Sequence, residues 1–205
     1  MPARPAPWDG CAVVVLAGGA SRRMGHDKLV EPLVASPSVL DAVLAGVPDD
    51  VTPVVVGPVR RTERGVVTTR EDPPGGGPAA GIAAGLAAVL RWASPEPAHV
   101  AVLAGDAPFA PAAVPALLAA LRLDPVADVA VAQAPDGHVQ PLLAVYRTPA
   151  LARATAGDLA DRPARALMDH LTVVRVPVAG ETLLDVDTAA DLEVARRAAR
   201  ARLRS

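Results

Sequence analysis

Short runs of β-branched apolar residues alternate along the chain with longer segments whose apolar residues recur every three or four positions. Runs of the first kind are typical of strands buried on both faces, and the second spacing is typical of helices with one face in a core. Strands are predicted over 13–16, 52–57, 65–69 and 100–104. Helices are predicted over 38–47, after the turn at 70–78 and after Pro111, with inward-facing residues Ile82, Leu86, Val89, Leu90, Val114, Leu117, Leu118 and Leu121. This alternation indicates an α/β fold with a mostly parallel sheet covered on both sides.

The last third of the chain predicts further strands and a terminal helix. Strands are expected over 128–133, 141–146, 172–177 and 182–186, with two helical pieces within 150–171. The terminal helix begins at Thr188, and Thr188 and Asp191 have the spacing of a capping box. Residues 1–10 are expected to be a disordered or frayed lead-in. Residues 11–205 are expected to be a single domain, since no repeat or linker is visible.

Composition and charge restrict the class of protein. Hydrophobic residues make up 51% of the chain and aromatic residues 2%, so the core must consist of Ala, Val and Leu. A net charge of −2 argues against a surface that wraps nucleic acid. Cys11 is the one cysteine, which excludes an intrachain disulfide and suits a reducing cytosol. Because the chain has neither a signal peptide nor the roughly 18 apolar residues of a membrane span, we expect a cytoplasmic protein.

The first strand runs directly into a glycine-containing, cationic loop. Gly18 and Gly19 carry no Cβ, so a ligand can approach their backbone N–H groups closely. Arg and Lys side chains match phosphate oxygens, and the loop lacks both the P-loop spacing and the G-x-G-x-x-G fingerprint. It is a candidate polyphosphate site of another kind, and the alternative is a turn with solvated cations. The polar side chains of this loop include Ser21, Arg22, Arg23 and Lys28.

Three aspartates are candidate metal ligands. Asp106 follows the predicted strand 100–104, at the sheet edge where parallel α/β proteins bind ligands. Mg²⁺ takes one or two carboxylates together with phosphate oxygens and water. Asp185 and Asp187 would share one face of a strand, so one of them could complete the metal site. The alternatives are an Asx turn for Asp106 and a helix cap for Asp187. The cations between the second and third strands, Arg60, Arg61 and Arg64, are expected to be solvated.

Residues 16–28 resemble the signature of the MobA-like nucleotidyltransferases, which include the molybdenum cofactor guanylyltransferases. The matching residues are Leu16-Ala17-Gly18-Gly19-x-Ser21-x-Arg23-Met24-Gly25-x-Asp27-Lys28. Four later segments resemble the same family in the same order. They are the nucleobase loop Gly77-Pro78-Ala79-Ala80-Gly81, the metal motif Gly105-Asp106-Ala107-Pro108, the Gln140-Pro141 strand and the closing segment Asp187-Thr188-Ala189-Ala190-Asp191-Leu192.

The resemblance implies a single-domain, Rossmann-like three-layer α/β/α sandwich of the nucleotide-diphospho-sugar transferase kind. It also implies transfer of GMP from GTP to the phosphate of molybdopterin, with pyrophosphate released and Mg²⁺ as cofactor. Asp72 is the candidate acceptor for the N1–H and amine of guanine, because a carboxylate offers two acceptors side by side. The implied catalytic residues are Arg23, Lys28 and Asp106; the metal ligands are Asp106 and Asp187; and the acceptor side is Gln140, Pro141 and Asp185. The implied nucleotide-binding residues are Leu16, Ala17, Gly18, Gly19, Ser21, Arg23, Lys28, Asp72, Gly77, Pro78 and Ala79.

Several alternatives stay open on the sequence alone. Relatives that act on molybdopterin often carry Asn where this chain has Asp185 and Asp187, so a cytidylyltransferase or a guanylyltransferase of cobalamin or F420 biosynthesis remains possible. A non-catalytic nucleotide-binding module is the alternative from another class. The choice between Asp185 and Asp187 as second metal ligand, the role of His138 and the oligomeric state are undecided. No nucleic acid or membrane partner is expected, whereas handover partners among cofactor-pathway proteins are.

Overall fold

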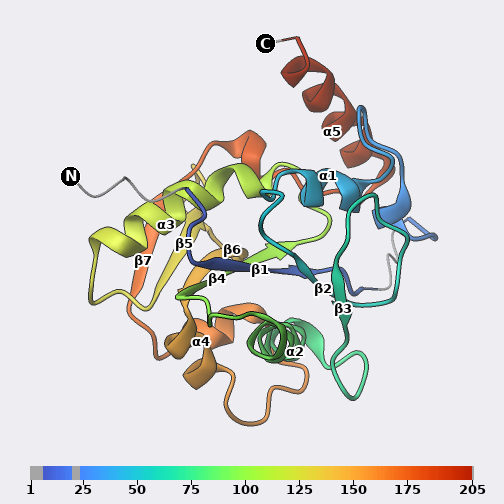
Figure 1. Cartoon of the computed structure of the whole chain (residues 1–205). Coiled ribbons are helices and arrows are strands. Elements are labelled where there is room, and N and C mark those ends of the chain that lie inside the picture. The colour runs from blue at the N-terminus through green and yellow to red at the C-terminus, as the bar shows by residue number, and fades with distance from the viewer. Residues whose placement is uncertain (1–6, 20–23, 205) are drawn as a thin grey trace.

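The computed structural model describes residues 7–19 and 24–204. Their strands form one seven-stranded sheet with the order β3-β2-β1-β4-β6-β5-β7 (Figure 1). Strand β6 is antiparallel to both of its neighbours, and the other strand pairs are parallel. The predicted mostly parallel sheet is therefore confirmed. The strands are β1 Cys11–Leu16, β2 Val54–Val56, β3 Val67–Thr69, β4 His99–Ala104, β5 Val129–Gln133, β6 Val139–Arg147 and β7 Val173–Pro177.

Helices cover both faces of the sheet, which gives the predicted three-layer sandwich (Figure 1). Helices α1 Val39–Ala45, α3 Val114–Leu123 and α5 Ala189–Arg202 lie on one side, and α2 Gly77–Trp92 and α4 Thr148–Ala154 lie on the other. Short 3-10 helices are η1 Lys28–Val30, η2 Ala110–Ala113, η3 Ala164–Met168 and η4 Gly180–Leu183. Among the described residues no helix is both long and apolar enough to cross a membrane.

The central strands supply side chains to two separate cores. Val13 and Val15 of β1 face the α1–α3–α5 side, and Val14 faces the α2 side. This alternation follows from the two-residue period of a strand. Most of the side chains in both cores are branched aliphatic or alanine, as the low aromatic content predicts, and Trp8, Phe109 and Tyr146 are buried among them.

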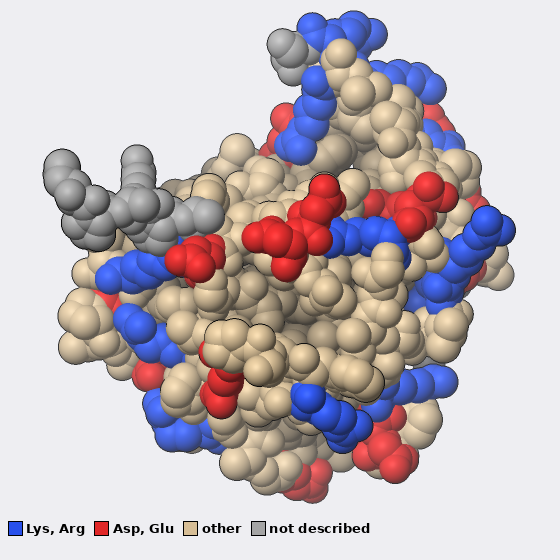
Figure 2. All heavy atoms as spheres, viewed as in Figure 1, with Lys and Arg blue, Asp and Glu red and all other residues tan. Residues whose placement is uncertain are grey.

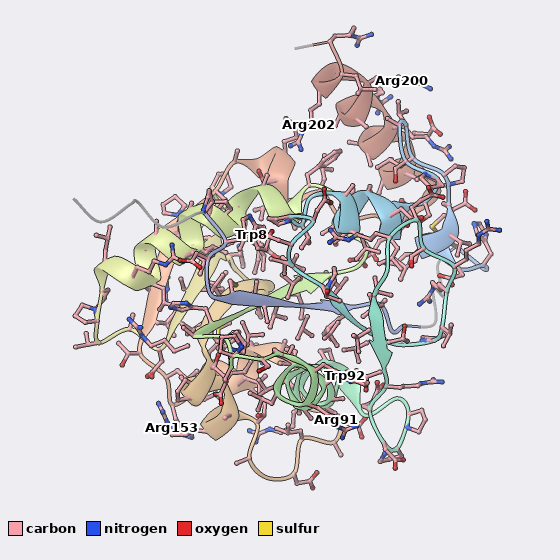
Figure 3. All side chains as sticks on the ribbon, viewed as in Figure 1. Trp8, Arg91, Trp92, Arg153, Arg200 and Arg202 are labelled. Atoms are coloured by element: carbon pink, nitrogen blue, oxygen red, sulfur yellow. The ribbon has the colours of Figure 1, made fainter. Side chains whose placement is uncertain are left out.

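The two ends of the chain are held by different contacts. Residues 1–6 of the expected lead-in lie outside the described residues, whereas residues 7–10 form a turn in which Trp8 is 8% exposed (Figure 3). Helix α5 begins with the predicted capping box between Thr188 and Asp191. Near its other end the guanidinium of Arg202 lies 4.0 Å from the ring centroid of Phe109 and hydrogen-bonds Glu181.

The predicted strand over 182–186 is wrong. Residues Gly180–Leu183 form η4, and the extended segment after it is not part of the sheet that the described residues form. The N–H of Val186 instead donates to the carbonyl of Asp106, at 2.9 Å. The segment therefore crosses the carboxyl end of β4 rather than pairing along a sheet edge. Leu90, predicted to face inward, is 42% exposed.

The expectation of a solvated connection between β2 and β3 is wrong for two of its three arginines. Arg61 is exposed, but the side chain of Arg60 is 7% exposed and hydrogen-bonds Asp27 and the carbonyl of Ala17. Arg64 donates four hydrogen bonds to main-chain carbonyls near the end of α1. A buried guanidinium needs such partners, because an unpaired buried charge is costly.

Candidate active site

The loop after β1 leaves the sheet between the ends of β2 and β4. The N–H of Ala17 donates to the carbonyl of Val56, and the N–H of Gly105 donates to the carbonyl of Leu16, both at 2.8 Å. A Cβ at Gly57 would lie 2.7 Å from the carbonyl atoms of Ala17, and the φ of Gly57 is +146°. Only glycine fits there, so the backbone at the end of β2 packs directly against the peptide between Ala17 and Gly18.

The backbone at Gly18 and Gly19 faces open space. Both residues are exposed, and a Cβ added at either would meet no atom of residues 7–19 or 24–204 within 4 Å. A ligand therefore has room to approach these peptides, as the polyphosphate hypothesis requires. Ser21 and Arg23, which belong to the same predicted site, lie outside the described residues.

Lys28 lies between two of the predicted metal ligands. Its ammonium is 2.6 Å from Asp106 Oδ2 and 2.6 Å from Asp187 Oδ1, although these residues are 78 and 159 positions away in the chain. Asp106 follows β4 and Asp187 precedes α5, so both carboxylates reach the carboxyl edge of the sheet. Burial acts to lower the pKa of Lys28, but the two carboxylates that accept its hydrogen bonds raise it overall. The ammonium therefore remains charged at neutral pH.

The predicted acceptor-side residues line a hollow of about 240 Å³ beside this cluster. Asp106, Gln140, Pro141 and Asp185 all contribute to its wall, as do Thr182 and Leu183 of η4. The last two were missed by the sequence analysis, because the wrong strand assignment over 182–186 gave no reason to place them there. Burial, together with the charges of Asp187 and Asp106, raises the pKa of Asp185.

None of the predicted nucleobase residues lines the hollow beside the lysine cluster. Exposed Asp72 lines a second hollow, of about 550 Å³, on the outer face of α2, together with residues of the 155–160 loop. Gly77, Pro78 and Ala79 form the first turn of α2, where the N–H of Ala79 donates to the carbonyl of Arg162 at 3.2 Å. The backbone of Ala79 is thus already engaged within the protein.

His138 is separate from both hollows. Its side chain is 82% exposed in the turn between β5 and β6, with Nδ1 3.2 Å from Asp136 Oδ1. It lines neither hollow.

Figure 2 shows acidic and basic side chains interspersed over one face of the molecule, with basic ones gathered at the end of α5. Arg200 and Arg202 extend from that helix (Figure 3).

Asp106 and Asp187 are suitable ligands for a divalent cation. Their oxygens converge on one position that already holds a positive charge, the Lys28 ammonium. Among residues 7–19 and 24–204, no group of three His, Cys, Asp or Glu side chains is arranged to hold a metal. Two carboxylates fit Mg²⁺, which in nucleotide sites takes its remaining ligands from phosphates and water.

A glycine loop, a lysine and paired aspartates at the carboxyl edge of a mostly parallel sheet define a nucleotide-handling α/β protein. Residues 13–176 match the family model described as the MobA-like NTP transferase domain. The chain therefore belongs to the MobA-like NTP transferase family, as the sequence resemblance predicts.

Curated relatives and solved structures agree with this assignment. The chain is 34% identical over 196 residues to a molybdenum cofactor guanylyltransferase of Rhizobium leguminosarum bv. trifolii, covering 91% of each chain. It is 37% identical over 145 residues to one of Mesorhizobium japonicum, covering 67% of each. The molybdopterin-guanine dinucleotide biosynthesis protein A of Archaeoglobus fulgidus has the same fold, with a TM-score of 0.67 and 24% identity over 92% of this chain and 98% of that chain.

Proposed function

We propose that the protein is a molybdenum cofactor guanylyltransferase, which transfers GMP from GTP to the phosphate of molybdopterin and releases pyrophosphate. The observation that carries this proposal is the cluster of Lys28, Asp106 and Asp187 beside a hollow at the carboxyl edge of the sheet. The names of the curated relatives, of which one aligns over 91% of this chain, support the choice of substrates.

The chemistry is a displacement at the α-phosphorus of GTP. An oxygen of the acceptor phosphate forms the new P–O bond, and the bond to the bridging oxygen of pyrophosphate breaks. The acceptor phosphate is ionised at neutral pH, so no general base is required. Positioning and charge neutralisation then account for the rate enhancement.

The residues of this chain supply those two effects. The backbone at Gly18 and Gly19 and the ammonium of Lys28 bind the triphosphate, together with Arg23. Asp106 and Asp187 hold Mg²⁺, which when bound supplies charge neutralisation at the reacting phosphates. Gln140, Pro141 and Asp185 line the hollow that receives the acceptor. We assign the reaction to the cytoplasm and expect the product to pass to another protein of the cofactor pathway.

Nucleotide selectivity gives the first test. Binding to the native state raises the apparent melting temperature, so we expect a larger shift with GTP and Mg²⁺ than with CTP, ATP or UTP. A shift specific to CTP would replace the guanylyltransferase by a cytidylyltransferase. No shift with any of the four nucleotides would contradict enzymatic function.

The metal assignment has its own test. Asp106→Ala is expected to abolish pyrophosphate release from GTP and acceptor while leaving the fold intact by circular dichroism. Asp49→Ala, at an exposed position after α1, is the control and should keep the wild-type rate. Near-wild-type turnover by Asp106→Ala in the presence of Mg²⁺ would show that the metal is held elsewhere.

A further inference from the structure

The guanidinium of Arg60 joins two parts of the candidate site that are separate in sequence. Its Nε donates to Asp27 Oδ2 at 2.7 Å, and one terminal nitrogen donates to the carbonyl of Ala17, also at 2.7 Å. The side chain is 7% exposed, so these contacts are shielded from water. Arg60 comes from the connection between β2 and β3, and it contacts the β1 loop on both sides of residues 18–26.

Besides a 3.3 Å hydrogen bond to the carbonyl of Pro58, the two shorter contacts of Arg60 each lead to a group proposed to bind phosphate. The carbonyl of Ala17 belongs to the same peptide as the N–H of Gly18. On the other side, Asp27 Oδ1 accepts from the N–H of Leu29 at 3.1 Å and so caps η1, the turn that begins with Lys28. Arg60 therefore lies between the backbone donors of the loop and the lysine.

We propose that Arg60 is a positioning residue for the nucleotide: it fixes the separation between the Gly18–Gly19 peptides and the ammonium of Lys28. This inference rests on the proposed function. The two shorter hydrogen bonds of Arg60 are to Asp27, next to the turn, and to the first peptide of the loop. A planar guanidinium suits this role, because its donors point in fixed, different directions, whereas a lysine ammonium is a compact charge on a flexible stem.

Arg64 provides a matched control from the same connection. It also donates several hydrogen bonds from a sheltered position, to the carbonyls of Leu44, Val47, Pro48 and Val51. Those carbonyls belong to the end of α1 and the turn after it, away from the β1 loop. Loss of Arg64 should therefore weaken the fold without altering the nucleotide site.

The experiment compares Arg60→Lys with Arg64→Lys, each assayed well below its own melting temperature. Arg60→Lys is expected to raise the Kd of GTP with Mg²⁺, measured calorimetrically, roughly tenfold, and to raise KM for GTP while leaving KM for the acceptor unchanged. Arg64→Lys should keep both KM values. A purely structural role for Arg60 would lower the melting temperature and leave the Kd of the folded fraction as in the wild type.

Asp27→Asn keeps the test decisive if Arg60→Lys folds poorly. Asparagine still caps η1, but it lacks the charge that pairs with Arg60, so the same rise in Kd is expected. Because Asp27 acts on Arg60 through the contact that Arg60→Lys also removes, the double variant should lose little more than Arg60→Lys alone. If Asp27→Asn or Arg60→Lys binds GTP with the same Kd as the wild type, the positioning role of Arg60 is overturned and the proposed function is unaffected. A wild-type protein that binds no GTP would overturn both this inference and the proposed function.

Discussion

Lys28 holds the position between Asp106 and Asp187 that a divalent cation would also favour. Two carboxylates that face one point repel each other unless a cation or proton lies between them. In the nucleotide-free protein the ammonium provides that charge. When GTP is bound, we expect the lysine to pair with the phosphates and the carboxylates to pair with Mg²⁺.

Replacing Lys28 tests two roles separately: stabilisation of the transition state, and pairing with the carboxylates of Asp106 and Asp187 when no nucleotide is bound. Lys28→Met is expected to lower kcat/KM by about 10²–10³-fold, because a charge that stabilises the transition state is lost. Without nucleotide, millimolar Mg²⁺ should raise the melting temperature of this variant more than that of the wild type, since the metal replaces the ammonium. Adding Asp187→Asn should remove the extra shift. Equal Mg²⁺ shifts in wild type and Lys28→Met would contradict the paired-carboxylate site.

Residues in the site differ in how far the sequence could predict them. The loop, Lys28 and Asp106 could be placed at one edge because the ends of parallel strands meet there, whereas the sequence left the choice between Asp185 and Asp187 open. Arg60 could not be placed there, because an arginine between two short strands has the local pattern of a solvated loop. Only the order of strands β3-β2-β1 brings it against the β1 loop. Ser21 and Arg23 remain predictions.

At the scale of elements, helix α2 lies unusually close to β1. A Cβ at Gly85 would lie 2.4 Å from Val14 Cγ1 and 3.0 Å from Val56 Cγ2. Gly85→Ala gains about 1 kcal/mol of helix propensity, yet overpacking of a filled core costs about 1–3 kcal/mol. We expect a net loss in the free energy of unfolding, measured by urea denaturation. Adding Val14→Ala to Gly85→Ala should recover part of this loss. If Gly85→Ala alone were more stable than the wild type, helix α2 would have to shift to make room for the methyl group.

Strand β4 carries the buried histidine His99, which is 8% exposed. Neither ring nitrogen has a hydrogen-bond partner among the described residues. Burial, with the charges of Arg122 and Arg147, lowers the pKa of His99. The unfolded chain therefore takes up a proton first as the pH falls below 6.5, so the native state loses stability from that pH downward.

This loss is testable with a substitution that does not titrate. In His99→Gln the fall in melting temperature between pH 7 and pH 5.5 should be smaller than in the wild type. Val126→Gln, at a position that is 73% exposed and carries no titratable group, should keep the wild-type slope and serves as control. Identical slopes in wild type and His99→Gln would show that another group causes the acid sensitivity.

Local pattern predicted most elements, and the wrong assignment over 182–186 has a specific cause. A short run such as Thr-Leu-Leu-Asp-Val at 182–186 indicates an extended segment, but not whether a neighbouring strand is available. Here the N–H of Val186 finds its acceptor in the carbonyl of Asp106. The spacing of Thr188 and Asp191 predicted the following helix correctly, because a capping box is a local signal.

At the scale of the whole molecule, the single thiol reports on global opening. Cys11 is 6% exposed at the start of β1, and burial raises the pKa of the thiol to about 12. A reagent that needs the thiolate should therefore react only with opened molecules. GTP with Mg²⁺ at a hundred times its Kd should slow labelling about a hundredfold, because bound nucleotide stabilises the closed state. Fast labelling that ignores nucleotide would reveal a local opening of the first strand.

The position of β6 between β4 and β5 has a consequence for how such a chain can change over generations. Everything proposed to bind GTP precedes residue 107, except Asp187, while the hollow assigned to the acceptor takes most of its wall from β6 and η4. Most residues proposed to select the nucleotide are thus encoded before most of those proposed to select the acceptor. A recombination event within α3 would exchange one preference and retain the other. New pairings of nucleotide and cofactor precursor can then arise from existing halves, without rebuilding the pocket residue by residue.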